Sequence, residues 1–373
     1  MKHRSQLMEK QLPNFRDLIF QFSVYGDFLV GVPFGNGNIN DTYQLTFDQG
    51  GIRLHYILQR INHQVFTRPE LVMENVTRVT DHILSEIRNA RQETKKRTLR
   101  WLRTREGAAF IRDASGNYWR AYIFVEHARA YEALETPEQA YRVAAAFGEF
   151  QRQLSDLPGE RLHETIPDFH NTPRYFKKLE DAVKADIAGR ARRVAAEIDF
   201  LMDRSTETDT LIRLNREGSI PERVTHNDTK ANNILIDDLS GEGICVLDLD
   251  TVMPGLSLYD FGDMVRSGAN PAEEDEQDLD KVGMSFPMYK AFHEGYLHSA
   301  GEMMTPAERE MMPFSCKLLA MELASRFLAD YLSGDVYFKV RRPAQNLDRT
   351  RTQIKLVQSM ESQFSKMVAL LKK

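Results

Sequence analysis

The chain has 373 residues, of which 42% are hydrophobic and 28% charged, and its formal net charge is −5. This composition is ordinary for a globular protein, and the slightly acidic balance gives no electrostatic reason to expect nucleic acid as a partner. The sequence contains no apolar leader run, no stretch long enough to span a membrane and only two isolated cysteines, so we expect a cytoplasmic protein without a membrane partner.

The first part of the chain shows the pattern of an antiparallel sheet. Asp27–Pro33 and Asn40–Phe47 are predicted strands, joined by a glycine-bearing turn. Most such turns only connect strands, but their backbone N–H groups can also approach phosphates, as the glycine-rich loop of kinases does. The candidate phosphate-covering residues are Gly35, Asn36, Gly37 and Asn38.

The third predicted strand, Ile52–Ile61, is the place where a kinase would carry a lysine that pairs with phosphates. No lysine is present, and either Gln59 or Arg60 takes its place. These two side chains point to opposite faces of the strand, and the alternation alone does not decide between them. Arg60 could supply the missing charge. Glu74, on a predicted helix from Pro69 to Arg91, is the candidate partner for that charge, although both groups could equally be solvated.

A further strand is predicted over Trp119–Glu126, leading through His127–Tyr131 into helix. Helical periodicity then dominates. The predicted fold class is therefore α+β, with residues 1–126 as a small N-terminal nucleotide-binding lobe, 127–136 as a hinge, and 137–373 as a larger, mainly helical catalytic and substrate-binding lobe. The helical segments are Tyr141–Leu154, Tyr175–Met202, Met284–His298, Pro306–Asp330 and Arg349–Leu371.

Two short apolar runs, Ile234–Ile236 and Ile244–Leu247, flank a turn-forming segment and predict a β-hairpin. Asn233 precedes the first strand and Asp248 follows the second, so the hairpin would bring both side chains to its open end. An amide oxygen beside a carboxylate suits Mg²⁺, which takes few protein ligands together with phosphate oxygens and water. Asp250 would compete as a ligand only if the register slipped by two residues.

The pair His226-x-Asp228 lies just upstream, with Asp228 five residues before Asn233. This is the spacing of the kinase catalytic loop, in which the Asp accepts the proton of the substrate hydroxyl and the Asn binds metal. Lys230 adds a cation that could reach a transferring phosphate. Single residues of these types often only cap helices or close turns, but the complete pattern predicts phosphoryl transfer. A metal-dependent hydrolase built from the same residues is the alternative.

Arg326 and Tyr337 stand on either side of a Ser-Gly-Asp turn in the segment Ala324–Val340. From the residues alone, packing and surface charge account for both side chains.

Four segments resemble the aminoglycoside phosphotransferase superfamily and, within it, the bacterial N-acetylhexosamine 1-kinases: HNDTKANNILID, VLDLDTVMPGLSLYDFGD, YILQRIN and GNGNINDTY. The resemblance runs from about residue 30 to about residue 340. It implies a protein-kinase-like bilobal fold with a catalytic hairpin in the C-terminal lobe. It also implies ATP and Mg²⁺ as cofactors, and phosphorylation of the anomeric hydroxyl of a small-molecule sugar, GlcNAc or GalNAc.

By position, Asp228 matches the catalytic base of this family, and Asn233 and Asp248 match its metal ligands. Arg326 and Tyr337 look like the pair that, with the base, contacts the sugar. The missing strand lysine departs from the wider superfamily, as does Asn232, which replaces a small residue. Two other functions stay open: a related phosphotransferase acting on another hydroxyl acceptor (an aminoglycoside, an amino alcohol or another sugar), and an inactive nucleotide-binding regulator. The sequence does not specify an oligomeric state.

Overall fold

The computed structural model describes residues 12–35, 39–89 and 97–372. Asn36, Gly37 and Asn38, predicted to cover phosphate, lie outside the described residues. The chain forms two compact units. The first ends at Thr77 and also contains Leu99–Glu126, and the second contains Arg78–Thr98 and His127–Lys373. One boundary therefore falls between Glu126 and His127, and residues 78–98 group with the second unit.

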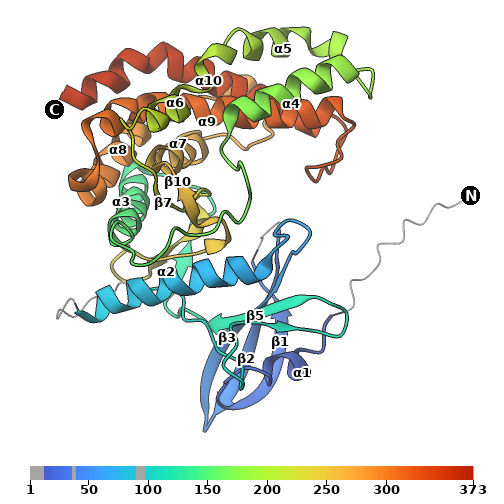
Figure 1. Ribbon diagram of the computed structural model, residues 1–373, viewed down its shortest axis with the longest axis vertical. Coiled ribbons are helices and arrows are strands. Elements are labelled where there is room, and N and C mark those ends of the chain that lie inside the picture. The colour runs from blue at the N-terminus through green and yellow to red at the C-terminus, as the bar shows by residue number, and fades with distance from the viewer. Residues whose placement is uncertain (1–11, 36–38, 90–96, 373) are drawn as a thin grey trace, which may run out of the picture. The chain divides into compact units, whose positions relative to one another are not determined.

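The first unit is built on a five-stranded antiparallel sheet with the order β1-β2-β3-β5-β4 (Figure 1). Alternating apolar residues of β2 and β3, including Leu45, Phe47 and Leu58, pack on one face against Trp119 and the short helix α1. The strands and the helix are β1 (Asp27–Pro33), β2 (Asp41–Gln49), β3 (Ile52–Ile61), β4 (Ile111–Arg112), β5 (Tyr118–Ile123) and α1 (Phe15–Ile19). The predicted antiparallel sheet is confirmed.

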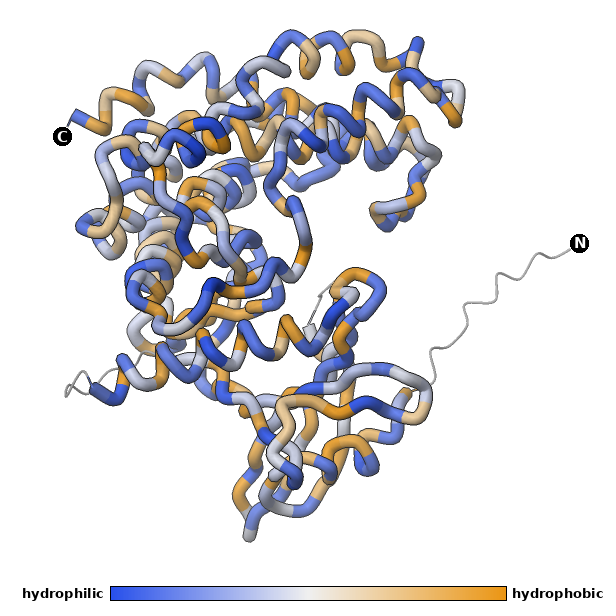
Figure 2. Tube along the Cα trace, viewed as in Figure 1, coloured by the Kyte–Doolittle hydropathy of each residue, from blue (hydrophilic) through white to orange (hydrophobic). Residues whose placement is uncertain are grey.

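Helix α2 (Pro69–Asn89) begins in the first unit and ends in the second. Hydrophobic and hydrophilic residues alternate along it at helical spacing, as Figure 2 shows. In the second unit, Arg78 donates to the backbone oxygens of Pro158 and Glu160, and His82 contacts the backbone oxygen of Gln153. These contacts attach the part of α2 from Arg78 onward to the second unit.

The second unit is mainly helical and carries short strands around one hairpin (Figure 1). Its longest helix, α9 (Pro306–Leu332), begins at a capping box formed by Thr305 and Glu308, and most of its length is buried. Its elements also include α3 (Pro137–Gln153), α4 (Thr172–Ala185), α5 (Ala195–Met202), α6 (Thr210–Arg216), α7 (Ser257–Gly268), α8 (Phe286–Ala300), α10 (Gln345–Ala369), β6 (Ala128–Ala130), β7 (Arg223–Thr225), β8 (Ile234–Asp237), β9 (Gly243–Val246) and β10 (Met253–Gly255).

Two predictions for this unit were wrong in detail. The segment His127–Tyr131 does not pass directly into helix: Ala128–Ala130 first forms strand β6, which pairs with β8, and helix α3 begins only at Pro137. The predicted helical segment Tyr175–Met202 is interrupted after α4, where Asp186 adopts a left-handed φ of 35°. The carboxylate of Asp186 then accepts hydrogen bonds from the backbone N–H groups of Arg190 and Ala191, at 2.7 and 3.0 Å. These bonds stabilise the interruption.

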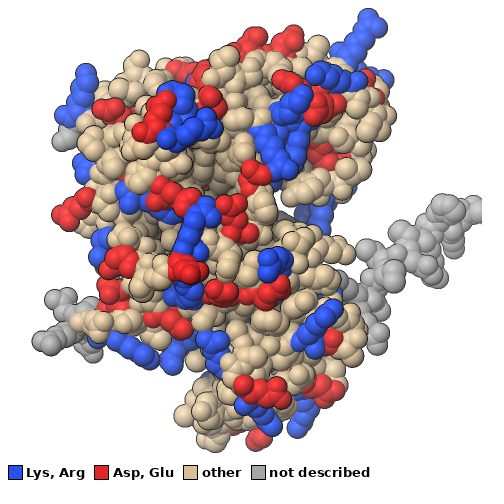
Figure 3. Space-filling view, viewed as in Figure 1, with Lys and Arg blue, Asp and Glu red and all other residues tan. Residues whose placement is uncertain are grey.

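Acidic and basic side chains are interspersed on the face shown in Figure 3. This fits the modest net charge of −5. Among the helices that the structure describes, none is both long enough and apolar enough to cross a membrane.

Candidate active site

The predicted hairpin forms from β8 and β9, which pair antiparallel with Ile234 opposite Val246. At its open end, the backbone N–H of Leu247 donates to the backbone oxygen of Asn233 at 2.8 Å. Asp248 follows Leu247 directly. The hairpin thus places the segment that ends in Asn233 beside the segment that carries Asp248.

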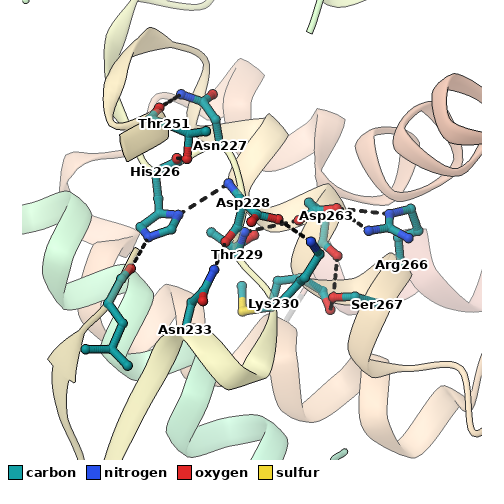
Figure 4. A network of polar contacts seen from close by, with 12 residues as sticks. His226, Asn227, Asp228, Thr229, Lys230, Asn233, Thr251, Asp263, Arg266 and Ser267 are labelled. Carbon is teal, nitrogen blue, oxygen red and sulfur yellow. Dashed lines mark hydrogen bonds and ion pairs between the residues drawn. The ribbon is translucent and has the colours of Figure 1, made fainter. Parts of the chain in front are cut away.

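Hydrogen bonds of two side chains hold the loop between β7 and β8 (Figure 4). Nε2 of His226 lies 2.8 Å from the backbone oxygen of Leu247. Nδ1 of the same ring accepts a hydrogen bond from the backbone N–H of Asp228 at 3.3 Å. The amide nitrogen of Asn233 donates to the backbone oxygen of Asp228 at 2.8 Å. With the nitrogen used in this way, the amide oxygen of Asn233 is the atom that can bind a cation. Both contacts of His226 position the loop.

Asp228 and Lys230 form an ion pair at 2.9 Å, with side chains 25% and 47% exposed. Burial opposes ionisation of Asp228, but the ammonium of Lys230 outweighs it and lowers the pKa of this carboxyl below its ordinary value. The same carboxylate raises the pKa of Lys230. At neutral pH the loop therefore presents a carboxylate beside a cation.

Asp260, on α7, binds the backbone of the same loop through hydrogen bonds. Its fully buried carboxylate accepts the N–H of His226 at 2.9 Å and the N–H of Asn227 at 2.7 Å. A third bond comes from the amide of Gln151 at 2.6 Å. Burial raises the pKa of Asp260, although these donors oppose the shift. No local sequence pattern predicts this role of Asp260, because its carboxylate reaches a loop more than thirty residues earlier in the chain.

Asp263, one turn further along α7, supports the next residue of the loop. One of its oxygens accepts the N–H of Thr229 at 3.1 Å, and the other accepts two bonds from Arg266, at 2.6 and 2.9 Å (Figure 4). The segment YDFGD, singled out as part of the resemblance, thus supplies two carboxylates that fix the loop carrying Asp228.

Asp248 and Asp250 differ in exposure, and this bears on which could bind a metal. Asp248 is exposed and has a left-handed φ of 51°, whereas Asp250 is 1% exposed. The exposed carboxylate and the amide oxygen of Asn233 form a hard-oxygen donor set that fits Mg²⁺. Among the described residues, no group of three His, Cys, Asp or Glu side chains could hold a metal. A cation here would therefore complete its shell with phosphate oxygens and water.

In the first unit, β3 places Arg60 and Gln59 on opposite faces. Arg60 shares the face of Leu58, which belongs to the core, and its guanidinium pairs with Asp41 on β2. On the other face, Gln59 accepts two bonds from Arg120 of β5, at 2.6 and 2.9 Å. Gln59 thus has a guanidinium beside it, whereas the charge of Arg60 is paired with a carboxylate.

The other two first-unit candidates are Gly35 and Glu74. Gly35 has a φ of +74°, which favours glycine, and a Cβ there would meet nothing within 4 Å. Glu74 lies on an exposed position of α2.

Arg326 lies on α9 among three aromatic rings. Its guanidinium carbon is 4.8 Å from the ring centroid of Tyr175, 5.7 Å from that of Phe338 and 5.8 Å from that of Phe169. The ring of Tyr337 packs edge-on against Phe338 at 4.8 Å and is itself 71% exposed. The structure thus brings Arg326 and Tyr337, eleven residues apart in the chain, into one aromatic cluster.

The loop that carries Tyr337 is held by Asp330, a residue that the sequence analysis did not assign. Its carboxylate accepts the backbone N–H groups of Val336, Tyr337 and Phe338 at 2.8–3.0 Å. Asn346 of α10 donates to the same carboxylate at 2.9 Å. An Asp followed by a Ser-Gly-Asp turn is a recognisable local signal for a carboxylate that binds the backbone N–H groups of the loop after it.

A model of the phosphotransferase enzyme family matches residues 30–294, more than half of the chain. The structure is similar to an aminoglycoside phosphotransferase from Alicyclobacillus acidocaldarius, with 12% identity, 99% of each chain covered and a TM-score of 0.65. It is also similar to a microcompartment-associated aminopropanol kinase, with 16% identity, coverage of 94% of this chain and 97% of that chain, and a TM-score of 0.59. A spectinomycin phosphotransferase in complex with ADP and spectinomycin matches at 14% identity, covering 90% of this chain and 94% of that chain, with a TM-score of 0.53. At these identities the structures indicate a shared fold, and the predicted protein-kinase-like α+β fold is confirmed.

Proposed function

This chain belongs to the phosphotransferase enzyme family, and from that premise we propose that it phosphorylates the anomeric hydroxyl of an N-acetylhexosamine, GlcNAc or GalNAc. It is an enzyme that transfers a phosphoryl group to a hydroxyl of a small molecule. ATP and Mg²⁺, the cofactors predicted from the sequence, are those of this family. The identity of the acceptor and the roles of single residues are the parts that we propose.

The observation that carries the choice of acceptor is the guanidinium of Arg326 within its aromatic cluster. Aromatic rings stack on the apolar face of a sugar, and a guanidinium donates hydrogen bonds to a neutral carbonyl such as that of an N-acetyl group. Amino alcohols and aminoglycosides are cations, and a fixed positive charge at the same place would repel them. A neutral acetamido sugar fits this surface better.

A chain of contacts connects Arg326 to the proposed base. Arg326 follows Glu322 by one helical turn on α9, so both side chains point to the same side of the helix. Glu322 contacts His170 at 3.0 Å, and His170 contacts the backbone oxygen of Asn227, the neighbour of Asp228, at 3.2 Å. The aromatic cluster therefore lies one turn of α9 away from the support of the catalytic loop.

In the proposed mechanism Asp228 orients the sugar hydroxyl and accepts its proton while the oxygen bonds to the γ-phosphorus. The bond from that phosphorus to the β–γ bridging oxygen breaks, and ADP leaves. Lys230 offsets negative charge as the phosphoryl group moves. Bound Mg²⁺ neutralises phosphate oxygens in this chemistry, and Asn233 and Asp248 are the residues that would hold it. Positioning and charge, rather than covalent catalysis, supply the acceleration.

The test is ADP release from ATP–Mg²⁺ with a panel of acceptors: GlcNAc, GalNAc, glucose, galactose, an aminoglycoside and choline. We expect turnover of the two N-acetylated sugars in preference to the others, and its loss in Asp228→Asn. Turnover with choline or the aminoglycoside alone would overturn the sugar assignment and keep the phosphotransferase. ATP–Mg²⁺ binding without turnover of any acceptor would favour the inactive regulator.

A further inference from the structure

The peptide group that joins Asn227 to Asp228 is held on both sides by histidines. Its carbonyl oxygen lies 3.2 Å from Nε2 of His170, and its N–H donates to Nδ1 of His226 at 3.3 Å. A carbonyl oxygen only accepts hydrogen bonds, so His170 must carry a proton on Nε2. His226 must present an unprotonated Nδ1, and its Nε2 donates to the backbone oxygen of Leu247.

The second nitrogen of His170 also faces an acceptor. Its Nδ1 lies 3.0 Å from Oε1 of Glu322, a carboxylate with no exposed surface. The other oxygen of Glu322 accepts the hydroxyl of Thr172 at 2.7 Å. With an ionised Glu322 at Nδ1 and a carbonyl oxygen at Nε2, His170 satisfies both contacts only as an imidazolium.

The surroundings of His170 favour the charged ring. Burial alone would lower its pKa, but Glu322 outweighs burial, and the more distant Asp263 of α7 adds to the effect, so the pKa of His170 is raised. Tyr259 of α7 stacks at 4.8 Å between ring centroids, and burial keeps its hydroxyl neutral by raising its pKa. Apart from burial, the carboxylates and the Asn227 carbonyl around the ring all raise its pKa.

The peptide that this ring contacts begins at a residue in the left-handed region. Asn227 has a φ of 67°, which asparagine adopts more readily than most other non-glycine residues. Its side-chain amide also donates to the backbone oxygen of Thr251 at 2.9 Å. The orientation of Asp228 depends on this held peptide, because Asp228 is the next residue in the chain.

We propose that His170 is a positioning residue for phosphoryl transfer: as an imidazolium paired with Glu322 it binds the Asn227 carbonyl and fixes the peptide from which the base Asp228 projects. The proposal rests on Asp228 acting as the base, and it is independent of which acceptor is phosphorylated.

Deprotonation removes one of the two hydrogen bonds. A neutral ring that keeps Nε2–H directs a lone pair at the Glu322 carboxylate, and the other tautomer directs a lone pair at the Asn227 carbonyl. Because the folded pKa is raised, the intact arrangement is present below that pKa and is lost as the pH rises through it. Turnover should therefore fall on the alkaline side, with kcat changing more than KM.

Two substitutions separate positioning from simple folding. His170→Gln can donate from its amide to the Asn227 carbonyl and does not titrate, so we expect it to retain kcat at neutral pH within roughly tenfold and to lose the alkaline fall. His170→Phe keeps a ring but no donor, and we expect kcat to drop by roughly 10²-fold at every pH with little change in the KM values, because small misplacements of catalytic groups cost about that much.

His82→Gln is the matched control. The Nε2 atom of His82 also contacts a backbone oxygen, that of Gln153 at 2.8 Å, and a carboxylate, that of Asp156 at 3.2 Å. His82 lies on α2, outside the catalytic loop. The kcat and pH profile of His82→Gln should therefore match those of the parent enzyme. Thermal unfolding of all variants shows whether a lost kcat reflects a lost fold.

A readout without any acceptor tests the same proposal. Imidazole ¹⁵N chemical shifts at neutral pH, assigned by the signals lost in His170→Gln, should report two protonated nitrogens on His170. A neutral His170 ring would overturn the proposal, as would an unchanged kcat in folded His170→Phe or an unchanged alkaline fall in His170→Gln. Absence of turnover in the parent enzyme would instead count against the proposed function, and the chemical shifts would still decide the state of His170.

Discussion

The catalytic loop and the aromatic cluster around Arg326 are held in different ways. Backbone groups of the loop from His226 to Thr229 bond to buried side chains that lie far away in sequence, on α7 and before α4. The aromatic cluster rests on ring contacts and on one carboxylate, Asp330, and its outermost ring, Tyr337, is 71% exposed. The difference indicates a rigid part, which we propose performs the chemistry, and a more adaptable part, which we propose selects the acceptor.

Asp228→Asn should produce the largest effect, because it removes the proton acceptor from the rigid part. A positioned general base contributes roughly 10²–10⁴-fold, so we expect kcat to fall by at least ~10²-fold while the KM for the acceptor changes little. Steady-state kinetics with GlcNAc measures both constants. Asp238→Asn, at an exposed carboxylate in the turn of the same hairpin, is the control for the loss of one charge. Undiminished turnover in Asp228→Asn would contradict its role.

Much of this rigid part was visible in the sequence, and the reason is local. The hairpin followed from two apolar runs around a turn, just as, in the first unit, the strands β1 and β3 were predicted with the observed bounds. The distance of Asn233 and Asp248 from that turn then predicted that they meet. Properties that depend on neighbours within a few residues can be inferred from the sequence alone.

The supports of the loop could not be inferred in this way. Asp260 reaches the loop from 34 residues further along the chain, and His170 reaches it from 57 residues before it. Strand β6 has only three residues and exists because β8 lies beside it. Such contacts follow from the packed topology, which a local pattern does not encode. The exposure of Asp248 and burial of Asp250, two positions apart, likewise appear only in the folded chain.

Arg326→Ala should have the next largest effect, and it should act on binding. A hydrogen bond to a charged group contributes about 1.5–3 kcal/mol, so we expect the KM for an N-acetylated sugar to rise roughly 10–10²-fold with the KM for ATP unchanged. The preference for GlcNAc over glucose should shrink by a similar factor. Arg16→Ala, which removes a guanidinium lying 5.6 Å from the Phe20 ring centroid in the first unit, is the control. An unchanged preference would exclude Arg326 from recognition of the acetamido group.

Lys230→Met should have a smaller effect on rate and a distinct effect on pH dependence. The cation lowers the pKa of Asp228 and so favours its ionised form. Without it, burial remains as the main influence and raises that pKa. We expect the acid limb of kcat to move to higher pH and the plateau rate to fall about tenfold, since charge stabilisation near the phosphates is reduced. An acid limb at an unchanged pH would show that Asp228 and Lys230 are not paired in the working enzyme.

Tyr337→Phe should have the smallest effect and bears directly on how adaptable the acceptor side is. The substitution removes a hydroxyl and keeps the ring, whose contact with Phe338 and whose backbone bond to Asp330 are retained. An exposed hydroxyl exchanges water for a sugar hydroxyl at little net gain, so the KM for the acceptor should rise only a few-fold, consistent with about 0.5–1.5 kcal/mol for a neutral hydrogen bond. Asp330→Asn weakens the support of the same loop and should exceed Tyr337→Phe in its effect on KM while leaving kcat near that of the parent. If Tyr337→Phe lowered kcat as strongly as Asp228→Asn, the loop would belong with the rigid part, and the division between chemistry and selection would fail.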